Sequence, residues 1–216
     1  MNTKRGIFIT FEGPDGAGKT TQIEKLAQYL EEQKLPYVLT KEPGGTRIGN
    51  EIRSLILRPE YKEMMNETEV LLYAASRAQH VREKIIPALE EGKIVLCDRF
   101  VDASIAYQGY GLGIEIEKIA AINEFATGGL VPDRSYFIDV APSFARKRLM
   151  QRNGNRPFDR IEQKDIEYHE KVRNGFLRIY ENNRERIYLL DGHQAIDAIF
   201  QMIKEDFERL LLERRT

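Results

Sequence analysis

Apolar residues along this chain fall into two kinds of segment, and their alternation predicts the fold class. Five short segments are almost continuously apolar and rich in β-branched or aromatic residues, which is typical of buried strands in a parallel sheet. They cover residues 7–12, 37–42, 93–98, 134–140 and 186–191. The longer segments between them have apolar residues at helical spacing, as in residues 21–33. The pattern predicts an α/β fold with a five-stranded parallel sheet flanked by helices.

The end of the chain and its overall composition predict a single unit. Residues 195–215 repeat apolar residues at intervals of three and four, which predicts a closing amphipathic helix. No repeat, low-complexity tract or linker is visible in the 216 residues, of which 42% are hydrophobic. A chain of this size can bury a substantial core. We therefore expect one domain over residues 1–216.

Charge and cysteine usage exclude several classes of function. The formal net charge is -1, so we expect neither a nucleic-acid partner nor a membrane surface as a partner. The apolar run before Glu12 is too short for a signal peptide or a spanning helix. Cys97 is the only cysteine, which excludes an internal disulfide and suits a reducing compartment. The expected location is the cytoplasm.

A glycine-rich motif lies between the first predicted strand and the first predicted helix. Gly13, Gly18, Lys19 and Thr20 match the pattern G-x-x-x-x-G-K-[ST] in the strand–helix context that this motif requires. Glycines allow backbone N–H groups to turn toward phosphate oxygens, and the lysine reaches the outer phosphates. The threonine hydroxyl is a ligand for magnesium. The motif predicts a nucleoside triphosphate site, against the alternative of a purely structural turn.

Acidic residues follow four of the five predicted strands. They are Glu12, Glu42, Asp98 and Asp191. Because ligands of open α/β sheets bind beyond the carboxyl ends of the strands, these positions point to one edge as the site. Each carboxylate alone could equally be a helix cap or a solvated loop charge, and for Asp191 we favour that interpretation.

A phosphate-binding loop does not define the reaction. The guanine-reading NKxD segment of GTPases is absent, and motor or transporter ATPases normally have longer chains. A small-molecule kinase needs a second pocket for an acceptor. A nucleotide-dependent switch without an acceptor is the alternative from a different class.

Five segments bear on this choice: FEGPDGAGKTT, TKEPGGT, YAASRAQH, CDRFVDASIAYQG and DRIEQKD. In this order they resemble the thymidylate kinase family over nearly the whole chain. The resemblance implies a P-loop nucleoside monophosphate kinase fold, phosphorylation of dTMP to dTDP, ATP and Mg²⁺ as cofactors, and a homodimer. The same fold acting on dUMP, another monophosphate or a deoxynucleoside is the nearest alternative.

The resemblance assigns the acceptor base to a helical segment. Tyr73 and Arg77 are four residues apart, so they share a helix face and can reach one ligand together. In the family this aromatic ring stacks on thymine and the arginine binds a base carbonyl. The alternative is that Tyr73 belongs to the core and Arg77 to a surface ion pair. Ser104, Tyr107 and Gln108 match positions that contact the base or crowd the 2′ position of the sugar.

The phosphate and sugar of the acceptor are assigned to residues near the strand ends. Arg99 suits bidentate contact with the monophosphate, and Asp98 could support magnesium or its waters; a strand-end ion pair is the alternative. By resemblance, Asp15 binds the 3′ hydroxyl, and the loop that contains Glu42 and Pro43 packs beside the nucleotide. By the same resemblance Arg53 helps to hold the phosphate, although surface solvation explains that arginine equally well.

Residues 146–160 contain six basic residues and one acid, together with the helix breakers Gly154 and Pro157. A basic segment of this kind predicts a lid, at about residues 150–160, that closes over the triphosphate and directs arginines at the transferred group. Some relatives carry an arginine at the loop position that Gly16 occupies here, so Arg152 and Arg156 are the candidate catalytic arginines beside Lys19 and Arg99. The alternative is a solvated loop.

The phosphate-binding loop and the start of the first predicted helix are expected to form the donor side. The residues expected to bind the nucleotide cofactor are Gly13, Asp15, Gly16, Gly18, Lys19, Thr20 and Thr21. Magnesium is assigned to Thr20 and Asp98. The three histidines have no metal-ligand spacing and receive no chemistry.

Overall fold

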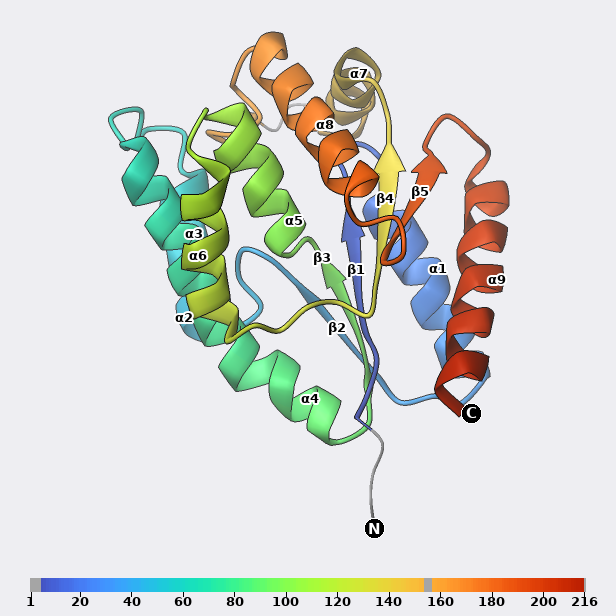
Figure 1. Cartoon of the computed structure of the whole chain (residues 1–216). Coiled ribbons are helices and arrows are strands. Elements are labelled where there is room, and N and C mark those ends of the chain that lie inside the picture. Colours follow the sequence, from blue (N-terminus) through green and yellow to red (C-terminus); the bar gives the residue numbers. More distant parts are fainter. Residues whose placement is uncertain (1–4, 154–156, 216) are drawn as a thin grey trace.

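The fold is built around a single parallel sheet with the strand order β2-β3-β1-β4-β5 (Figure 1). The structure is a computed structural model that describes residues 5–153 and 157–215. The strands are β1 (Phe8–Glu12), β2 (Tyr37–Lys41), β3 (Ile94–Asp98), β4 (Arg134–Asp139) and β5 (Ile187–Asp191). Each matches a predicted segment to within one residue at either end, and all four strand pairs are parallel. The predicted fold class is confirmed.

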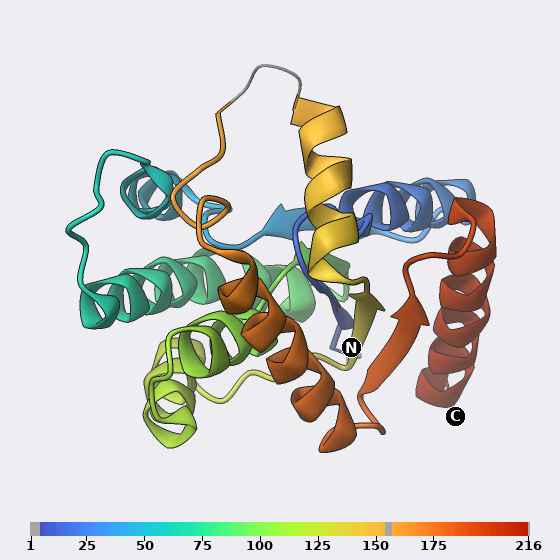
Figure 2. The same cartoon turned by 90° about the horizontal axis from the view of Figure 1, so that it is seen from above.

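Helices cover both faces of this sheet (Figures 1 and 2). They are α1 (Lys19–Glu32), α2 (Arg47–Leu57), α3 (Asn66–His80), α4 (Ile86–Glu90), α5 (Val101–Ser104), α6 (Ile116–Thr127), α7 (Pro142–Asn153), α8 (Ile166–Glu181) and α9 (Ile196–Arg215). Two π-helical stretches, η1 (Val81–Ile85) and η2 (Ile105–Gly111), continue α3 and α5. The predicted closing helix is α9, and the helix predicted over 21–33 begins two residues earlier, at Lys19.

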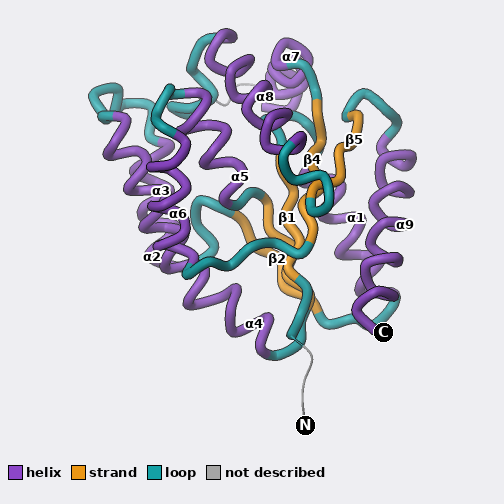
Figure 3. The backbone as a smooth tube through the Cα atoms, in the orientation of Figure 1, coloured by secondary structure: helices purple, strands orange, loops and turns teal. Residues whose placement is uncertain are grey.

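Two layers of helices enclose the sheet between them (Figure 3). Helices α1 and α9 pack on one face, where residues of β1 and β4 such as Phe11 and Tyr136 are completely buried. The α3–η1–α4 segment, α5 with η2, and α8 cover the other face, and α2 and α6 lie against α3. Burial of this apolar surface is the main favourable term for folding.

The edge strands differ from the prediction of complete burial. Strands β1 and β3 are buried along most of their length, whereas β2 and β5 are only partly buried, and Leu39 and Leu189 reach solvent. The reason is topological, because an edge strand has one neighbour and the helices cover the sheet centre first. Sequence pattern alone does not distinguish an edge from a centre.

The carboxyl ends of the strands face α7 and the beginning of α8 (Figure 2). The candidate lid begins on α7, which ends at Asn153, and continues at Pro157. Residues 154–156, and therefore Arg156, lie outside the described residues, as does the side chain of Arg152. Within the described ranges, no helix has the length and apolar character needed to cross a membrane.

Candidate active site

The phosphate-binding loop connects β1 to α1 and needs glycine for conformational reasons. Gly13 and Gly16 have φ angles of +128° and +86°, in the region that side chains rarely adopt. A Cβ atom at Gly13 would lie 2.4 Å from the carbonyl oxygen of Ile138, and one at Gly16 would lie 2.5 Å from that of Ala145. At Gly18 the N-terminus of α1 has no side-chain cap, so its N–H groups stay available to an anion.

Lys19 is held in place by the loop that precedes it. Its buried Nζ donates to the carbonyl oxygens of Gly13 at 3.1 Å and Pro14 at 3.0 Å. It also lies 3.8 Å from Asp15 Oδ1 and 3.9 Å from Asp98 Oδ1. Burial lowers the pKa of Lys19, and the nearby Arg99 adds to this, while the two aspartates oppose it. A triphosphate at this point would supply the negative charge that a buried ammonium group requires.

The turn after β3 forces Arg99 into an unusual backbone conformation with φ at +72°. Three hydrogen bonds hold the turn. The Arg99 N–H donates to the Phe11 carbonyl at 3.0 Å, and the Cys97 thiol donates to the Arg99 carbonyl at 3.1 Å. The Phe100 N–H donates to Glu12 Oε1 at 2.8 Å. A non-glycine residue at positive φ persists only where its surroundings impose it, and such residues cluster at functional sites.

The Arg99 side chain reaches over the phosphate-binding loop. Its Nη2 donates to Asp15 Oδ1 at 2.9 Å and to Tyr107 Oη at 3.1 Å, while Nη1 is buried without a partner among the described residues. Although burial opposes it, Arg99 together with Lys19 holds the pKa of Asp15 well below its usual range. The unpartnered N–H groups are the kind of donor that binds a phosphate dianion.

A cavity of about 150 Å³ lies beside this arginine. All ten predicted acceptor-side residues line it: Asp15, Glu42, Pro43, Arg53, Tyr73, Arg77, Arg99, Ser104, Tyr107 and Gln108. Sequence reasoning missed five further lining residues, namely Leu57, Ala103, Asp159, Ile161 and Glu162. The available signal for three of them was the segment DRIEQKD, which carried the family resemblance but received no role. The individual roles of the ten remain predictions.

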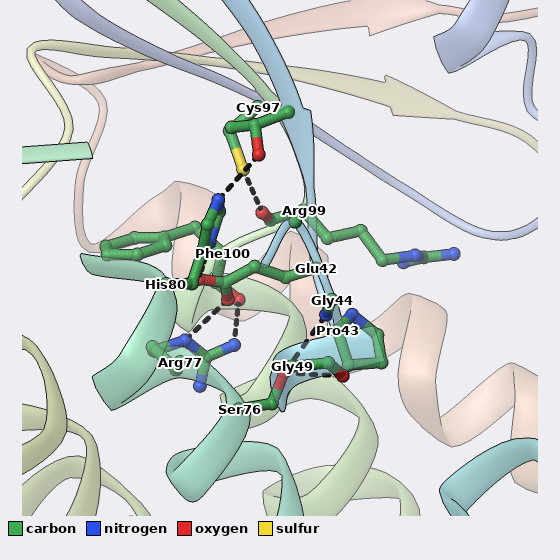
Figure 4. Close-up of polar contacts among 12 residues, drawn as sticks. Glu42, Pro43, Gly44, Gly49, Ser76, Arg77, His80, Cys97, Arg99 and Phe100 are labelled. Carbon is green, nitrogen blue, oxygen red and sulfur yellow. Dashed lines mark hydrogen bonds and ion pairs between the residues drawn. The ribbon is translucent and has the colours of Figure 1, made fainter. Parts of the chain in front are cut away.

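Arg77 lies inside a buried polar network rather than at the surface (Figure 4). Its Nε donates to Glu42 Oε2 at 2.7 Å, so the ion pair that we considered for it exists, but both side chains are buried. The second oxygen of Glu42 lies 2.9 Å from Nδ1 of His80, whose Nε2 lies 2.6 Å from Thr40 Oγ1. His80, to which the sequence assigned no chemistry, thus orients Glu42.

The loop after Glu42 packs tightly against α2 and α3. The Gly44 N–H donates to Ser76 Oγ at 3.0 Å (Figure 4), and Arg53 Nη1 donates to the Pro43 carbonyl at 2.9 Å. Gly45 has φ at +83°, and a Cβ atom there would lie 2.6 Å from Nε2 of His80. Arg53 therefore lines the cavity and is held there by its hydrogen bond to the loop. This bond explains the position of the side chain better than solvation at the surface does.

A second cavity of about 280 Å³ lies on the other side of the phosphate-binding loop. Gly16, Gly18 and Thr21 line it together with Arg148, Gly192, Gln194 and Ile196, among others. Arg148 donates from Nη1 to the Gly192 carbonyl at 3.2 Å, and its guanidinium lies 4.4 Å from the Phe144 ring centroid. The sequence analysis assigned none of Arg148, Gly192, Gln194 and Ile196 to a site, although Arg148 belongs to the basic segment at residues 146–160.

The two residues assigned to magnesium, Thr20 and Asp98, suit an ion whose other ligands come from the substrate phosphates and from water. Among the described residues, no group of three or more His, Cys, Asp or Glu side chains could enclose a metal ion. Thr20 is exposed at the start of α1, and among the described residues no hydrogen-bond partner reaches the buried Asp98 Oδ1. Mg²⁺ is usually held by one or two side chains plus phosphates and water, which this pair can supply.

Comparison with known proteins places this geometry in a family. The family model described as thymidylate kinase matches residues 11–203. The chain belongs to the thymidylate kinase family. It is 54% identical to a thymidylate kinase of Exiguobacterium sibiricum over 209 residues, or 97% of either chain. It is 49% identical to one from a Geobacillus species over 198 residues, which are 92% of this chain and 94% of the relative.

A solved structure agrees with this family assignment. The thymidylate kinase of Ehrlichia chaffeensis is 34% identical, with a TM-score of 0.77 over 94% of this chain and 99% of that one. The predicted resemblance and the fold that it implied are therefore confirmed.

Proposed function

We propose that the protein transfers the γ-phosphoryl group of ATP to dTMP, producing ADP and dTDP. The observation that carries this proposal is the position of two consecutive loop residues. Asp15 lines the acceptor cavity and Gly16 lines the donor cavity, so the two cavities meet at the loop that holds Lys19. A phosphoryl group passing between them would remain within reach of Lys19 and Arg99.

The reaction balances without an added base. An oxygen of the acceptor's phosphate forms a bond to the γ-phosphorus while the bond from that phosphorus to the bridging oxygen breaks, and ADP leaves with the electron pair. Four charges on ATP and two on dTMP become three on each product, so no proton is required. The protein's contribution is positioning and electrostatic stabilisation.

The proposed roles come from the family resemblance, and the positions of the side chains around the cavity support them. Arg99 would orient the acceptor phosphate, Asp15 the 3′ hydroxyl, and Lys19 the outer phosphates of ATP. Tyr107, which lies against Arg99 with the guanidinium 4.9 Å from its ring centroid, would exclude a 2′ hydroxyl by its bulk. Tyr73 lines the same cavity, where its ring can stack on a base.

The remaining groups of the reaction are assigned from the sequence and the fit described above. Mg²⁺ would be held by Thr20 and Asp98, and when bound it supplies charge neutralisation of the phosphates. The catalytic arginine of the lid would be Arg152 or Arg156. Replacement of either by alanine should then lower kcat more than it raises KM for dTMP, and a change confined to KM would argue against that role.

We further propose a homodimer that uses the outer faces of α3 and α6. Phe125 on α6 is 89% exposed and Leu71 on α3 is 58% exposed, whereas the neighbouring Ile119 belongs to the core. Large apolar side chains on adjacent helices are typical of an interface. A cytoplasmic location agrees with the use of ATP and with a single buried thiol at Cys97.

The test is an assay of ADP release with ATP and magnesium, with each common deoxynucleoside and ribonucleoside monophosphate as acceptor. We expect turnover with dTMP to exceed turnover with dCMP, dAMP and dGMP by orders of magnitude, and the ribose counterparts to be poor acceptors. Substitution Lys19→Ala should remove most turnover while leaving the fold intact. Equal ADP release with no acceptor present would refute the kinase and leave a hydrolase.

A further inference from the structure

Gln108 brings an unsatisfied acceptor to the acceptor cavity. The side chain is 2% exposed and lines the cavity, and its Nε2 donates to Glu69 Oε1 at 3.0 Å. Its Oε1 is buried, and among the described residues no donor reaches it. A buried polar atom without a partner is costly, so this carbonyl oxygen is suited to a ligand that donates a hydrogen bond.

Glu69 determines which end of the Gln108 amide is left for the ligand. Glu69 is 1% exposed, and its second oxygen accepts from Arg160 Nη2 at 2.7 Å. Arg160 in turn donates from Nε to the Ile56 carbonyl at 2.8 Å, and its N–H donates to the Leu57 carbonyl at 3.1 Å. A carboxylate paired with a guanidinium only accepts hydrogen bonds. The Gln108 NH₂ group must therefore face Glu69, and its carbonyl oxygen is left over.

Arg77 lines the same cavity and supplies the complementary donor. A guanidinium has five N–H groups. Four are used inside the protein, by Glu42 Oε2, Ser104 Oγ, Asn123 Oδ1 and the Phe100 carbonyl oxygen. Within the described part of the chain one N–H on Nη2 therefore stays available. Apart from the free N–H groups of Arg99, which are assigned to the phosphate, the cavity thus offers a donor from Arg77 and an acceptor from Gln108, each fixed by buried partners.

This donor and acceptor match one class of pyrimidine. The 4-oxo pyrimidines, thymine and uracil, present a carbonyl acceptor at position 4 next to an N–H donor at position 3. The 4-amino pyrimidine cytosine presents an amino donor next to an acceptor nitrogen, which reverses both positions. We propose that Glu69, held by Arg160, is a positioning residue that fixes the orientation of the Gln108 amide and thereby selects 4-oxo over 4-amino pyrimidine monophosphates. The inference rests on the proposed phosphorylation of dTMP.

The critical variant replaces Glu69 by its isosteric amide. In Glu69→Gln, Arg160 requires the new carbonyl oxygen, so the new NH₂ group faces Gln108 and the Gln108 amide turns its own NH₂ into the cavity. The exchange variant Glu69→Gln with Gln108→Glu returns an acceptor to the cavity and keeps the number of buried carboxylates. Asp206→Asn is the matched control, because Asp206 is a buried carboxylate paired with Arg134 outside the cavity.

The measured quantity is the ratio of kcat/KM for dTMP to kcat/KM for 5-methyl-dCMP, which share the methyl group and differ at positions 3 and 4. We expect Glu69→Gln to lower this ratio by about 5- to 150-fold, mainly by raising KM for dTMP, since that is the cost of leaving a buried donor or acceptor mismatched. The exchange variant should recover most of the ratio, and Asp206→Asn should keep the wild-type ratio.

The possible results test the positioning role of Glu69 separately from the phosphorylation of dTMP on which it rests. An unchanged ratio in Glu69→Gln would overturn the positioning role while leaving dTMP phosphorylation intact. Equal losses in Glu69→Gln and Asp206→Asn would also overturn it, because the effect would then be general destabilisation. If Glu69→Gln does not fold, the exchange variant decides, since a ratio near one there overturns the inference. A wild-type protein without dTMP turnover would refute the proposed function itself.

Discussion

Glu12 is a buried carboxyl group whose raised pKa should make the fold less stable as the pH rises through the physiological range. It lies buried at the carboxyl end of β1, where Oε1 accepts the Phe100 N–H and Oε2 has no partner among the described residues. Burial, reinforced by the negative charge of Asp102, raises the pKa of Glu12 to about 8, against the opposing effects of Arg99, the Phe100 N–H and Lys19. In the unfolded chain its pKa is near the usual value of 4.5.

The sign of the pH effect follows from proton linkage. Between pH 4.5 and about 8 the folded protein keeps a proton on Glu12 that the unfolded chain has lost. The free energy of unfolding must therefore decrease as the pH rises through this window. At ~1.4 kcal/mol for each pH unit, the contribution of Glu12 between pH 5 and pH 7.5 is a loss on the order of 3 kcal/mol.

The substitution Glu12→Gln isolates this contribution. Glutamine has the same shape and can still accept the Phe100 N–H, but it does not titrate. Urea unfolding of both proteins at several pH values and constant ionic strength gives the difference in free energy of unfolding, in which the titrating groups that do not interact with Glu12 cancel. We expect this difference to move in favour of the variant from pH 5 to pH 7.5. A flat difference, or one that moves toward the wild type, would refute the raised pKa of Glu12.

Three further predictions concern the cavities and the outer surface. Arg99→Lys keeps the positive charge but loses the two-pronged guanidinium group. Because one charge-assisted hydrogen bond is worth roughly 1.5–3 kcal/mol, kcat/KM for dTMP should fall by about 10- to 150-fold. A fall below threefold, or an equal fall in the remote control Arg134→Lys, would contradict this prediction. Arg148→Ala removes a wall of the donor cavity and should raise KM for ATP while leaving KM for dTMP nearly unchanged, which initial rates at varied ATP will show. Phe125→Asp should convert the dimer to a monomer in sedimentation velocity at micromolar concentration, and a wild type that already sediments as a monomer would defeat the dimer proposal.

Much of the fold could be predicted because its signals are local. The five strand segments are apolar over consecutive residues, and the glycine positions of the phosphate-binding loop have φ angles that side chains rarely adopt. Such signals depend on residues a few positions apart, which a sequence displays directly. The partial exposure of β2 and β5 could not be predicted, since the strand order depends on how distant segments pair.

The acceptor-side residues could be named in advance only through the family resemblance. Their spacing along the chain does not reveal that Asp15, Tyr73 and Gln108 line one cavity. Asp159 and Glu162 were quoted within a motif yet received no role, because a carboxylate after a basic segment has no distinctive local pattern. Arg148 was missed for the same reason, one arginine among several in a charged helix.

By itself, the sequence determined the α/β class, the position of the phosphate-binding loop and the set of side chains able to meet a nucleotide. The tertiary structure decided how those side chains are oriented. Arg77 and Glu42 are 35 residues apart, and Arg160 and Glu69 are 91 residues apart, yet each pair is buried and bonded. The direction of a hydrogen bond depends on partners that folding brings together, because a buried donor or acceptor must be satisfied by whichever groups surround it.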